Sequence, residues 1–252
     1  MQRNRLFDEW IRSSPSGVPT CVRLICFPHA AGGASFYRPW AAGLGPGIEQ
    51  CIVQYPGRED RIRESCVVDM DEMADQVAEA ITPVLGQPVA LFGHSMGAAI
   101  AYEVARRIED QRPGSLTALI VSACRVAGQR RQVPAHLLDD EALAAHLGSL
   151  GAMKETIFRH PELLSIVLRA ARADYQLIET YAPSCVQRLK APIFALGGDR
   201  DSHATATDLA RWAELTSGGF KQRTFSGGHF YLVNQRREVV ETIRFHLSAR
   251  CA

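Results

Sequence analysis

Six short apolar runs, separated by longer helix-like segments, constrain the fold of this chain more than any other feature. Four of the runs are almost continuously apolar, which is typical of parallel strands covered on both faces of a sheet. The runs occupy residues 22–27, 50–55, 88–93, 116–123, 191–197 and 221–226. They predict a central sheet whose strands are mostly parallel.

Helix-like segments lie between these strands, and two of them carry apolar residues at spacings of three and four. The segments cover residues 71–85, 96–109, 205–216 and 236–248. A repeated strand–helix order places helices on both faces of a parallel sheet with right-handed crossovers. The sequence therefore predicts an α/β fold.

The alternation breaks between residues 126 and 190, where two helical stretches, about 139–150 and 160–181, replace a strand. We interpret this segment as a helical lid insertion over the carboxyl end of the sheet. A chain of 252 residues, 46% of them hydrophobic, can bury the core that such a fold needs. We expect a single domain over residues 1–252.

The charge and cysteine content narrow the classes of partner. A net charge of +1 gives no reason to expect a nucleic acid or an anionic membrane. The charged N-terminal stretch lacks the apolar core of a secretory signal, and no later run is long and apolar enough to span a bilayer. The seven cysteines show no CxxC spacing, which argues against a disulfide framework and a structural zinc site. We expect a soluble cytoplasmic protein in which most cysteines are buried.

The stretch LFGHSMGAA carries a Gly-x-Ser-x-Gly pattern at Gly93, Ser95 and Gly97. A strand precedes it and a helix follows, which is the context of a nucleophile elbow, a sharp turn that exposes the serine hydroxyl. The helix start also offers the amide of Met96 to a developing oxyanion. We predict that Ser95 is a nucleophile; the alternative is a turn whose glycines serve only close packing.

A serine nucleophile needs a base held by an acid, and in such folds the acid and then the histidine follow the serine. Asp199 and Asp201 come just after an apolar strand, and we favour Asp201 because it lies one turn beyond that strand. The alternative for Asp199 is a turn residue whose carboxylate bonds its own backbone. His229, in a glycine turn before the last helix, is the predicted base.

The other histidines are weaker candidates for the base. His29 precedes the serine, His94 adjoins it, and His203 is too close to the acid to complete a triad. We expect the remaining four to face solvent on helices or loops: His136, His146, His160 and His246.

The second donor of an oxyanion hole is expected in the loop after an early strand. The stretch CFPHAAGGASFYRPW leads from strand 22–27 into small residues that allow backbone amides to face inward. We assign the donor to the amide of Ala30, with Met96 as its partner. The alternative is a flexible loop without that role.

Six motifs, taken in order, resemble the stand-alone type II thioesterases of polyketide and nonribosomal peptide assembly lines. The resemblance covers residue 22 to about residue 245, and the motifs are FPHAAGGAS, QYPGREDR, GHSMGA, RADYQLIETY, LGGDRD and GGHFYL. It implies an α/β-hydrolase fold, a triad of Ser95, Asp201 and His229, and an oxyanion hole of the Ala30 and Met96 amides. It also implies hydrolysis of short or aberrant acyl groups from the phosphopantetheine arms of acyl or peptidyl carrier proteins, without a metal or a cofactor of its own. We expect a monomer.

Two positions depart from that family's pattern. The family usually has H-A-G-G where this chain has HAAGG, and S-G-R where this chain has SACR at residues 122–125. Ala31 and Ala123 therefore carry a methyl group where the family commonly has none. We expect an effect on the path of the oxyanion loop and on the pocket wall near the insertion.

Carrier proteins are acidic, so the resemblance implies a narrow and locally basic entrance. The candidate contacts are Arg58, Arg61, Arg63, Arg125, Arg130, Arg131 and Lys154. Arginines on helix faces are mostly solvated, and Arg58 has a second interpretation, an internal ion pair with Glu59, Asp60 or Asp174. Within the insertion, the apolar face from Leu164 to Ile178 is predicted to pack on the core, and Met153 and Phe158 are candidate lid residues.

Three other functions compete with an editing thioesterase. A general carboxylesterase of the same fold would turn over simple esters faster than carrier thioesters. A release or cyclising thioesterase is usually fused to a synthase. A non-catalytic protein that binds carrier proteins is disfavoured by an intact set of serine, acid and histidine.

Overall fold

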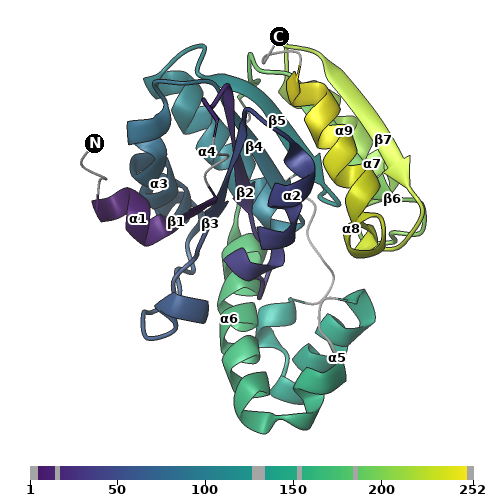
Figure 1. Ribbon diagram of the computed structural model, residues 1–252. Helices are drawn as coiled ribbons and strands as arrows, with labels where there is room; N and C mark the ends of the chain where they lie inside the picture. Colours follow the sequence, from purple (N-terminus) through teal and green to yellow (C-terminus); the bar gives the residue numbers. More distant parts are fainter. Residues whose placement is uncertain (1–4, 15–17, 127–133, 152–154, 184–186, 249–252) are drawn as a thin grey trace.

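The computed structural model describes residues 5–14, 18–126, 134–151, 155–183 and 187–248, and its centre is a seven-stranded sheet (Figure 1). The strand order is β1-β3-β2-β4-β5-β6-β7. Every neighbouring pair is parallel except β1 with β3, which is antiparallel. The bounds are β1 Ile11–Ser14, β2 Val22–Phe27, β3 Ile48–Val53, β4 Val89–His94, β5 Leu116–Ser122, β6 Ile193–Gly198 and β7 Phe220–Phe225. The predicted α/β fold is confirmed.

The sheet is covered on both faces because its inner strands are apolar at odd and even positions alike. In β2, Ile25 and Phe27 belong to one buried cluster, whereas Leu24 and Cys26 belong to another. Successive side chains of a strand point to opposite faces, so each cluster is the core of one face. The edge strand β7 has four consecutive exposed residues, as expected where only one neighbour is present.

Helices form the outer layers. One face carries α1 Arg5–Trp10, α3 Met70–Ile81 and α4 Met96–Gln111, and the other carries α2 Ala41–Leu44, α8 Tyr231–Asn234 and α9 Arg236–Ser248. The helix α7 Ala206–Ala210 and the 3-10 helix Arg211–Leu215 follow β6, and their buried residues Leu209, Trp212 and Leu215 belong to the same core as α3 and α4. Within the described residues, no helix is long and apolar enough to cross a membrane.

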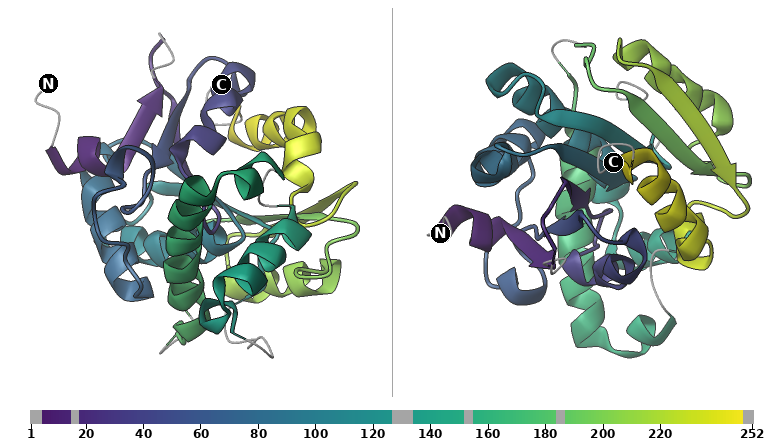
Figure 2. Two further views of the ribbon diagram at one scale, coloured as in Figure 1. Left: turned by 90° about the horizontal axis from the view of Figure 1, so that it is seen from below. Right: turned by 45° about the horizontal axis from the view of Figure 1, so that its top comes forward.

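Between β5 and β6 the chain forms α5 Asp140–Leu150 and α6 Pro161–Thr180, with 3-10 helices at Ala135–Leu137 and Glu155–Arg159. These two helices agree with the predicted helical stretches. They lie below the sheet in Figure 1 and face the viewer in the left view of Figure 2. A hydrogen bond from the Ala31 amide, in the loop after β2, to Asp174 of α6 places α6 at the carboxyl ends of the strands. We call α5 and α6 the cap helices.

Several boundaries differ from those predicted from the sequence. The predicted helix 71–85 ends at Ile81, and Pro83 lies in a 3-10 turn that follows, because proline cannot donate to a continuing helix. The predicted helix 205–216 divides into α7 and the 3-10 helix after it. The predicted strand 50–55 runs instead over Ile48–Val53. Strand β1 and the short helices α1, α2 and α8 were not predicted.

Candidate active site

Ser95 lies on a sharp turn between β4 and α4, with φ 54° and ψ −124°. The glycines on either side are required by close backbone approach. A Cβ on Gly93 would lie 2.2 Å from the carbonyl oxygen of Gly97, and a Cβ on Gly97 would lie 2.2 Å from that of Phe27. The Ser95 amide donates to the Ser122 carbonyl at 2.8 Å, which ties the turn to β5. The geometry is that of a nucleophile elbow.

His229 lies between Ser95 and Asp201. Its Nε2 is 3.0 Å from the Ser95 Oγ, and its Nδ1 is 2.8 Å from the Asp201 Oδ2. The Asp201 side chain is fully buried, and its second oxygen accepts the amides of His203 and Ala204. The three residues predicted from the sequence therefore form one continuous hydrogen-bonded chain, an arrangement that can move a proton from a serine hydroxyl to an imidazole.

The environment of Asp201 favours its ionised form. Burial alone would raise the pKa of its carboxyl, but the hydrogen bond and charge of His229, together with the two backbone amides, lower that pKa below its ordinary value. An ionised Asp201 accepts the Nδ1 proton of His229, which leaves Nε2 free to accept a proton from Ser95. Asp199 instead accepts the Gly227 amide at 2.8 Å, in the turn that leads to His229. Its carboxylate therefore bonds a turn that is distant in the sequence, and not the backbone of its own turn as in the alternative interpretation of Asp199.

The two predicted oxyanion donors lie at the ends of neighbouring strands. Ala30 follows β2 and Met96 follows β4, and the register pairs Phe27 with Gly93. Among the described residues, neither amide donates to a protein acceptor. The next amide, that of Ala31, is occupied because it donates to the Asp174 Oδ2 at 2.7 Å. Two such amides, directed at one oxygen, can together stabilise its negative charge.

Comparison with known proteins identifies the family. A family model for the thioesterase domain matches residues 22–247. The chain belongs to the thioesterase family.

The relatives of this thioesterase confirm the resemblance drawn from the motifs. Thioesterase PikA5 of Streptomyces venezuelae is 40% identical over 239 residues, which cover 94% of this chain and 85% of PikA5. The type II thioesterase BorB, from the borrelidin biosynthetic cluster, is 45% identical with a TM-score of 0.87 and covers 94% and 97% of the two chains. The type II thioesterase YbtT, from the yersiniabactin NRPS/PKS pathway, is 25% identical with a TM-score of 0.86 and covers 96% and 100%. The fold is that of an α/β-hydrolase.

Two further histidines of this thioesterase, His29 and His94, lie near His229, and burial keeps both neutral. Burial and the charges of His229 and Arg58 lower the pKa of His29 to about 3. Burial, followed by the charges of His229 and His29, lowers the pKa of His94 well below its ordinary value. The Nδ1 of His94 hydrogen-bonds the Ser122 hydroxyl, which in turn contacts the Tyr231 hydroxyl at 2.7 Å. His94 therefore links β4, β5 and the start of α8.

The expectation that four histidines face solvent is correct for His160 and wrong for the other three, which are half-buried. His136 is half-buried and pairs with Glu179 at 2.7 Å. His146 of α5 has ring contacts with Tyr175 and His203. His246 is half-buried and stacks on Phe194. Helical periodicity did not reveal these contacts because each partner lies far away in the sequence.

Two of the predicted basic contacts are interior residues. Arg58 and Arg61 are buried, so they cannot form an exposed basic patch. Arg58 pairs with Asp174, the last of the three internal partners considered, and Arg61 pairs with Glu9 and Glu64. Arg63 is exposed and Arg125 is half-buried. Arg130, Arg131, Lys154 and Met153 lie outside the described residues, as does the side chain of Phe158.

The predicted apolar face of α6 packs on the core. Leu168, Ala171, Tyr175 and Leu177 are buried, and Leu164, Val167 and Ile178 are half-buried against the same core. Of the five described cysteines, all free thiols, Cys26, Cys51 and Cys124 are buried. The described residues contain no cluster of three or more histidine, cysteine or acidic side chains that could hold a metal ion.

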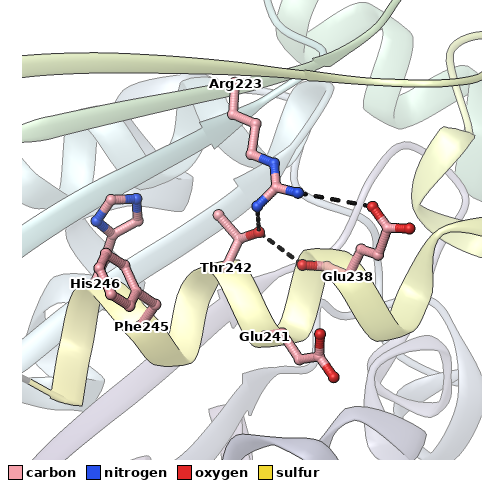
Figure 3. A pocket seen from close by; sticks show the side chains of 6 residues that line it. All are labelled: Arg223, Glu238, Glu241, Thr242, Phe245 and His246. Atoms are coloured by element: carbon pink, nitrogen blue, oxygen red, sulfur yellow. Dashed lines mark hydrogen bonds and ion pairs between the residues drawn. The ribbon is translucent and has the colours of Figure 1, made fainter.

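A surface hollow between β7 and α9 lies apart from these residues (Figure 3). Part of its polar lining is internally paired, because the Thr242 hydroxyl accepts a hydrogen bond from Arg223 and donates one to the Glu238 carbonyl. None of the predicted site residues lines it. We place the functional site at Ser95 because the hydrogen-bonded side chains meet there.

Proposed function

We propose that this thioesterase removes short or aberrant acyl groups from the phosphopantetheine arms of acyl or peptidyl carrier proteins in polyketide or nonribosomal peptide biosynthesis. The observation that carries the proposal is the chain of hydrogen bonds from Ser95 through His229 to Asp201, in a chain whose relatives include type II thioesterases. Ser95 is the nucleophile, His229 the general base and acid, and Asp201 the residue that orients His229.

In the first half-reaction, the Ser95 Oγ attacks the thioester carbonyl and its proton passes to the His229 Nε2. The carbonyl oxygen becomes an oxyanion and accepts hydrogen bonds from the Ala30 and Met96 amides. The carbon–sulfur bond then breaks and the leaving sulfur takes the proton from the His229 Nε2, so the phosphopantetheine arm leaves as a thiol and His229 is neutral again. A thiol has a pKa of about 8.5, so its departure needs little help from an acid.

In the second half-reaction, water loses a proton to His229 and attacks the acyl ester on Ser95. The oxyanion occupies the same two amides, and collapse of the intermediate releases the carboxylic acid and returns the proton to Ser95. In this scheme the enzyme needs no metal or cofactor of its own, since the phosphopantetheine belongs to the partner. We further propose a cytoplasmic monomer that meets its carrier proteins transiently.

A panel of carrier-bound thioesters tests the proposal. Purified enzyme is offered acetyl, propionyl, butyryl, malonyl and aminoacyl carrier proteins, and release is followed by mass spectrometry with Ser95→Ala as the control. We expect faster release of the decarboxylated short chains than of malonyl. The absence of release across the panel would overturn the editing function, and faster turnover of nitrophenyl esters than of any carrier thioester would favour a general carboxylesterase.

A further inference from the structure

Arg58 and Asp174 form a buried ion pair between the loop after β3 and cap helix α6. The guanidinium donates two parallel hydrogen bonds, from Nη1 to Oδ2 at 2.6 Å and from Nη2 to Oδ1 at 2.7 Å. The Asp174 side chain is fully buried and that of Arg58 is 6% exposed. Burial would lower the pKa of Arg58, but the charge and hydrogen bonds of Asp174 raise it above its ordinary value, so the guanidinium stays protonated.

Both members of the pair also bind the loop that contains Ala30. The Asp174 Oδ2 accepts the Ala31 amide at 2.7 Å, and the Arg58 Nη1 donates to the Gly32 carbonyl at 3.2 Å. The two contacts fall on the residues directly after the proposed oxyanion donor. Ala31 has a φ of 63°, a strained value for alanine that persists only when its surroundings hold it.

Neighbours of Arg58 hold the same loop further along. The Gln54 Oε1 accepts the Ala34 amide at 2.9 Å, and the Glu59 carboxylate accepts the amide and hydroxyl of Ser35. The segment from Gln54 to Glu59 is therefore a frame for residues 32–35. Asp174 completes that frame at Ala31, from a helix more than a hundred residues away in the sequence.

A buried ion pair is an inefficient way to gain stability, because desolvation of the two charges offsets most of their attraction. Geometric specificity explains the presence of this pair better than stability does, since a bidentate pair fixes both side chains in one arrangement. We propose that Arg58 and Asp174 are positioning residues: they hold the loop after β2 so that the Ala30 amide stays directed at the oxyanion, and they make α6 part of the frame of that hole. The inference rests on the proposed function only in its choice of oxyanion donors.

Asp174→Asn tests this inference with a stable analogue of the tetrahedral intermediate. The probe is a trifluoromethyl ketone that replaces the thioester of a butyryl pantetheine; the Ser95 Oγ adds to its carbonyl carbon, the proton passes to His229, and the resulting oxyanion binds the amides. We expect a fall in kcat of about 10- to 100-fold with KM nearly unchanged, and a rise in the ketone's inhibition constant by a similar factor. A loss of folded protein alone would lower the apparent kcat and leave the inhibition constant unchanged.

Glu49→Gln is the matched control, because Glu49 forms a largely buried ion pair with Arg23 at the opposite end of the parallel strands. It should lower stability without changing the inhibition constant. Arg58→Lys keeps the charge but loses the paired N–H groups, and serves if Asp174→Asn does not fold; we expect the same effects at a smaller size.

The outcomes separate this inference from the proposed function. An unchanged inhibition constant in Asp174→Asn and Arg58→Lys would overturn the positioning role. Wild-type enzyme that binds the ketone at Ser95 but releases nothing from carrier proteins would overturn the proposed substrate and leave the positioning role open to the same binding test. Wild-type enzyme that does not bind the ketone would overturn both.

Discussion

At the scale of single residues, backbone geometry and hydrogen bonding separate positions that look alike in the sequence. Asp199 and Asp201 lie two residues apart after the same strand, yet one carboxylate accepts the Gly227 amide and the other meets the His229 ring. Ala31 and Ala123, the two departures from the family's glycines, both have positive φ angles. Asp199 and Asp201 therefore have different roles although they are the same residue type. At Ala31 and Ala123 the backbone adopts a conformation that is strained for alanine.

Asp201→Asn and Asp199→Asn should differ strongly in activity. An amide at residue 201 favours the wrong tautomer of His229, so we expect kcat to fall by about 10⁴-fold. An amide at residue 199 still offers an oxygen to the Gly227 amide, so we expect a loss of less than about tenfold. Steady-state kinetics on a butyryl thioester measures both, and the reverse order would contradict the assignment of Asp201.

Ala123→Gly should cost far less stability than Ala105→Gly, although both alanines are buried. Each change removes a methyl group worth about 0.8 kcal/mol of burial. At residue 123, relief of the left-handed backbone, about 1–2 kcal/mol, offsets this loss. Inside α4, glycine adds a further cost of about 1 kcal/mol. Urea unfolding should show a near-neutral Ala123→Gly, and equal losses in the two variants would refute the strain at Ala123.

At the scale of elements, the sequence predicts those parts that carry a local pattern. The inner strands were predictable to within two residues because they are apolar on both faces, and the elbow because it needs both glycines. Strand β1, with the sequence IRSS, has no such pattern and owes its position to pairing with β3. The interior position of Arg61 was not predicted, because its partner Glu9 lies in α1, far away in the sequence. For Arg58, an internal ion pair with Asp174 was one of two interpretations, and the sequence did not decide between them.

Gly97→Ala tests the close approach between α4 and the end of β2. The added Cβ would meet the Phe27 carbonyl at 2.2 Å and backbone must move, so we expect a loss of stability of about 3 kcal/mol or more together with loss of activity. Gly86→Ala is the control, since an added Cβ there has no neighbour within 4 Å. It should be neutral or slightly stabilising. Similar unfolding midpoints for the two variants would contradict the packing of the elbow.

At the scale of the whole molecule, the site lies where the two halves of the chain meet. The proposed nucleophile follows a central strand, the proposed acid and base come from the last third of the sequence, and α6 reaches the loop after β2 from the insertion. The order of the three catalytic candidates could be predicted from the sequence. Their distances, and the buried histidines around them, follow only from the assembled fold.

The two buried neutral histidines make stability depend on pH. The folded pKa values of His29 and His94 lie below the unfolded value of about 6.5, so the unfolded chain binds more protons at moderately acid pH. Stability is therefore fully present above about pH 6.5 and falls as the pH drops toward 3, by up to about 1.4 kcal/mol per pH unit for each histidine. Urea unfolding from pH 7.5 to 4.5 should show this slope. It should be shallower in His29→Gln, and an unchanged slope would contradict the burial of a neutral His29.

The central claim is that carrier-bound acyl groups pass through Ser95. The most direct test mixes the enzyme with a butyryl carrier protein, quenches the reaction at intervals and follows intact protein and peptides by mass spectrometry. We predict a butyryl adduct on the peptide that contains Ser95, which forms as free carrier thiol appears and decays as butyrate is released, and no adduct or release with Ser95→Ala. Release of butyrate by Ser95→Ala at the wild-type rate would contradict the account.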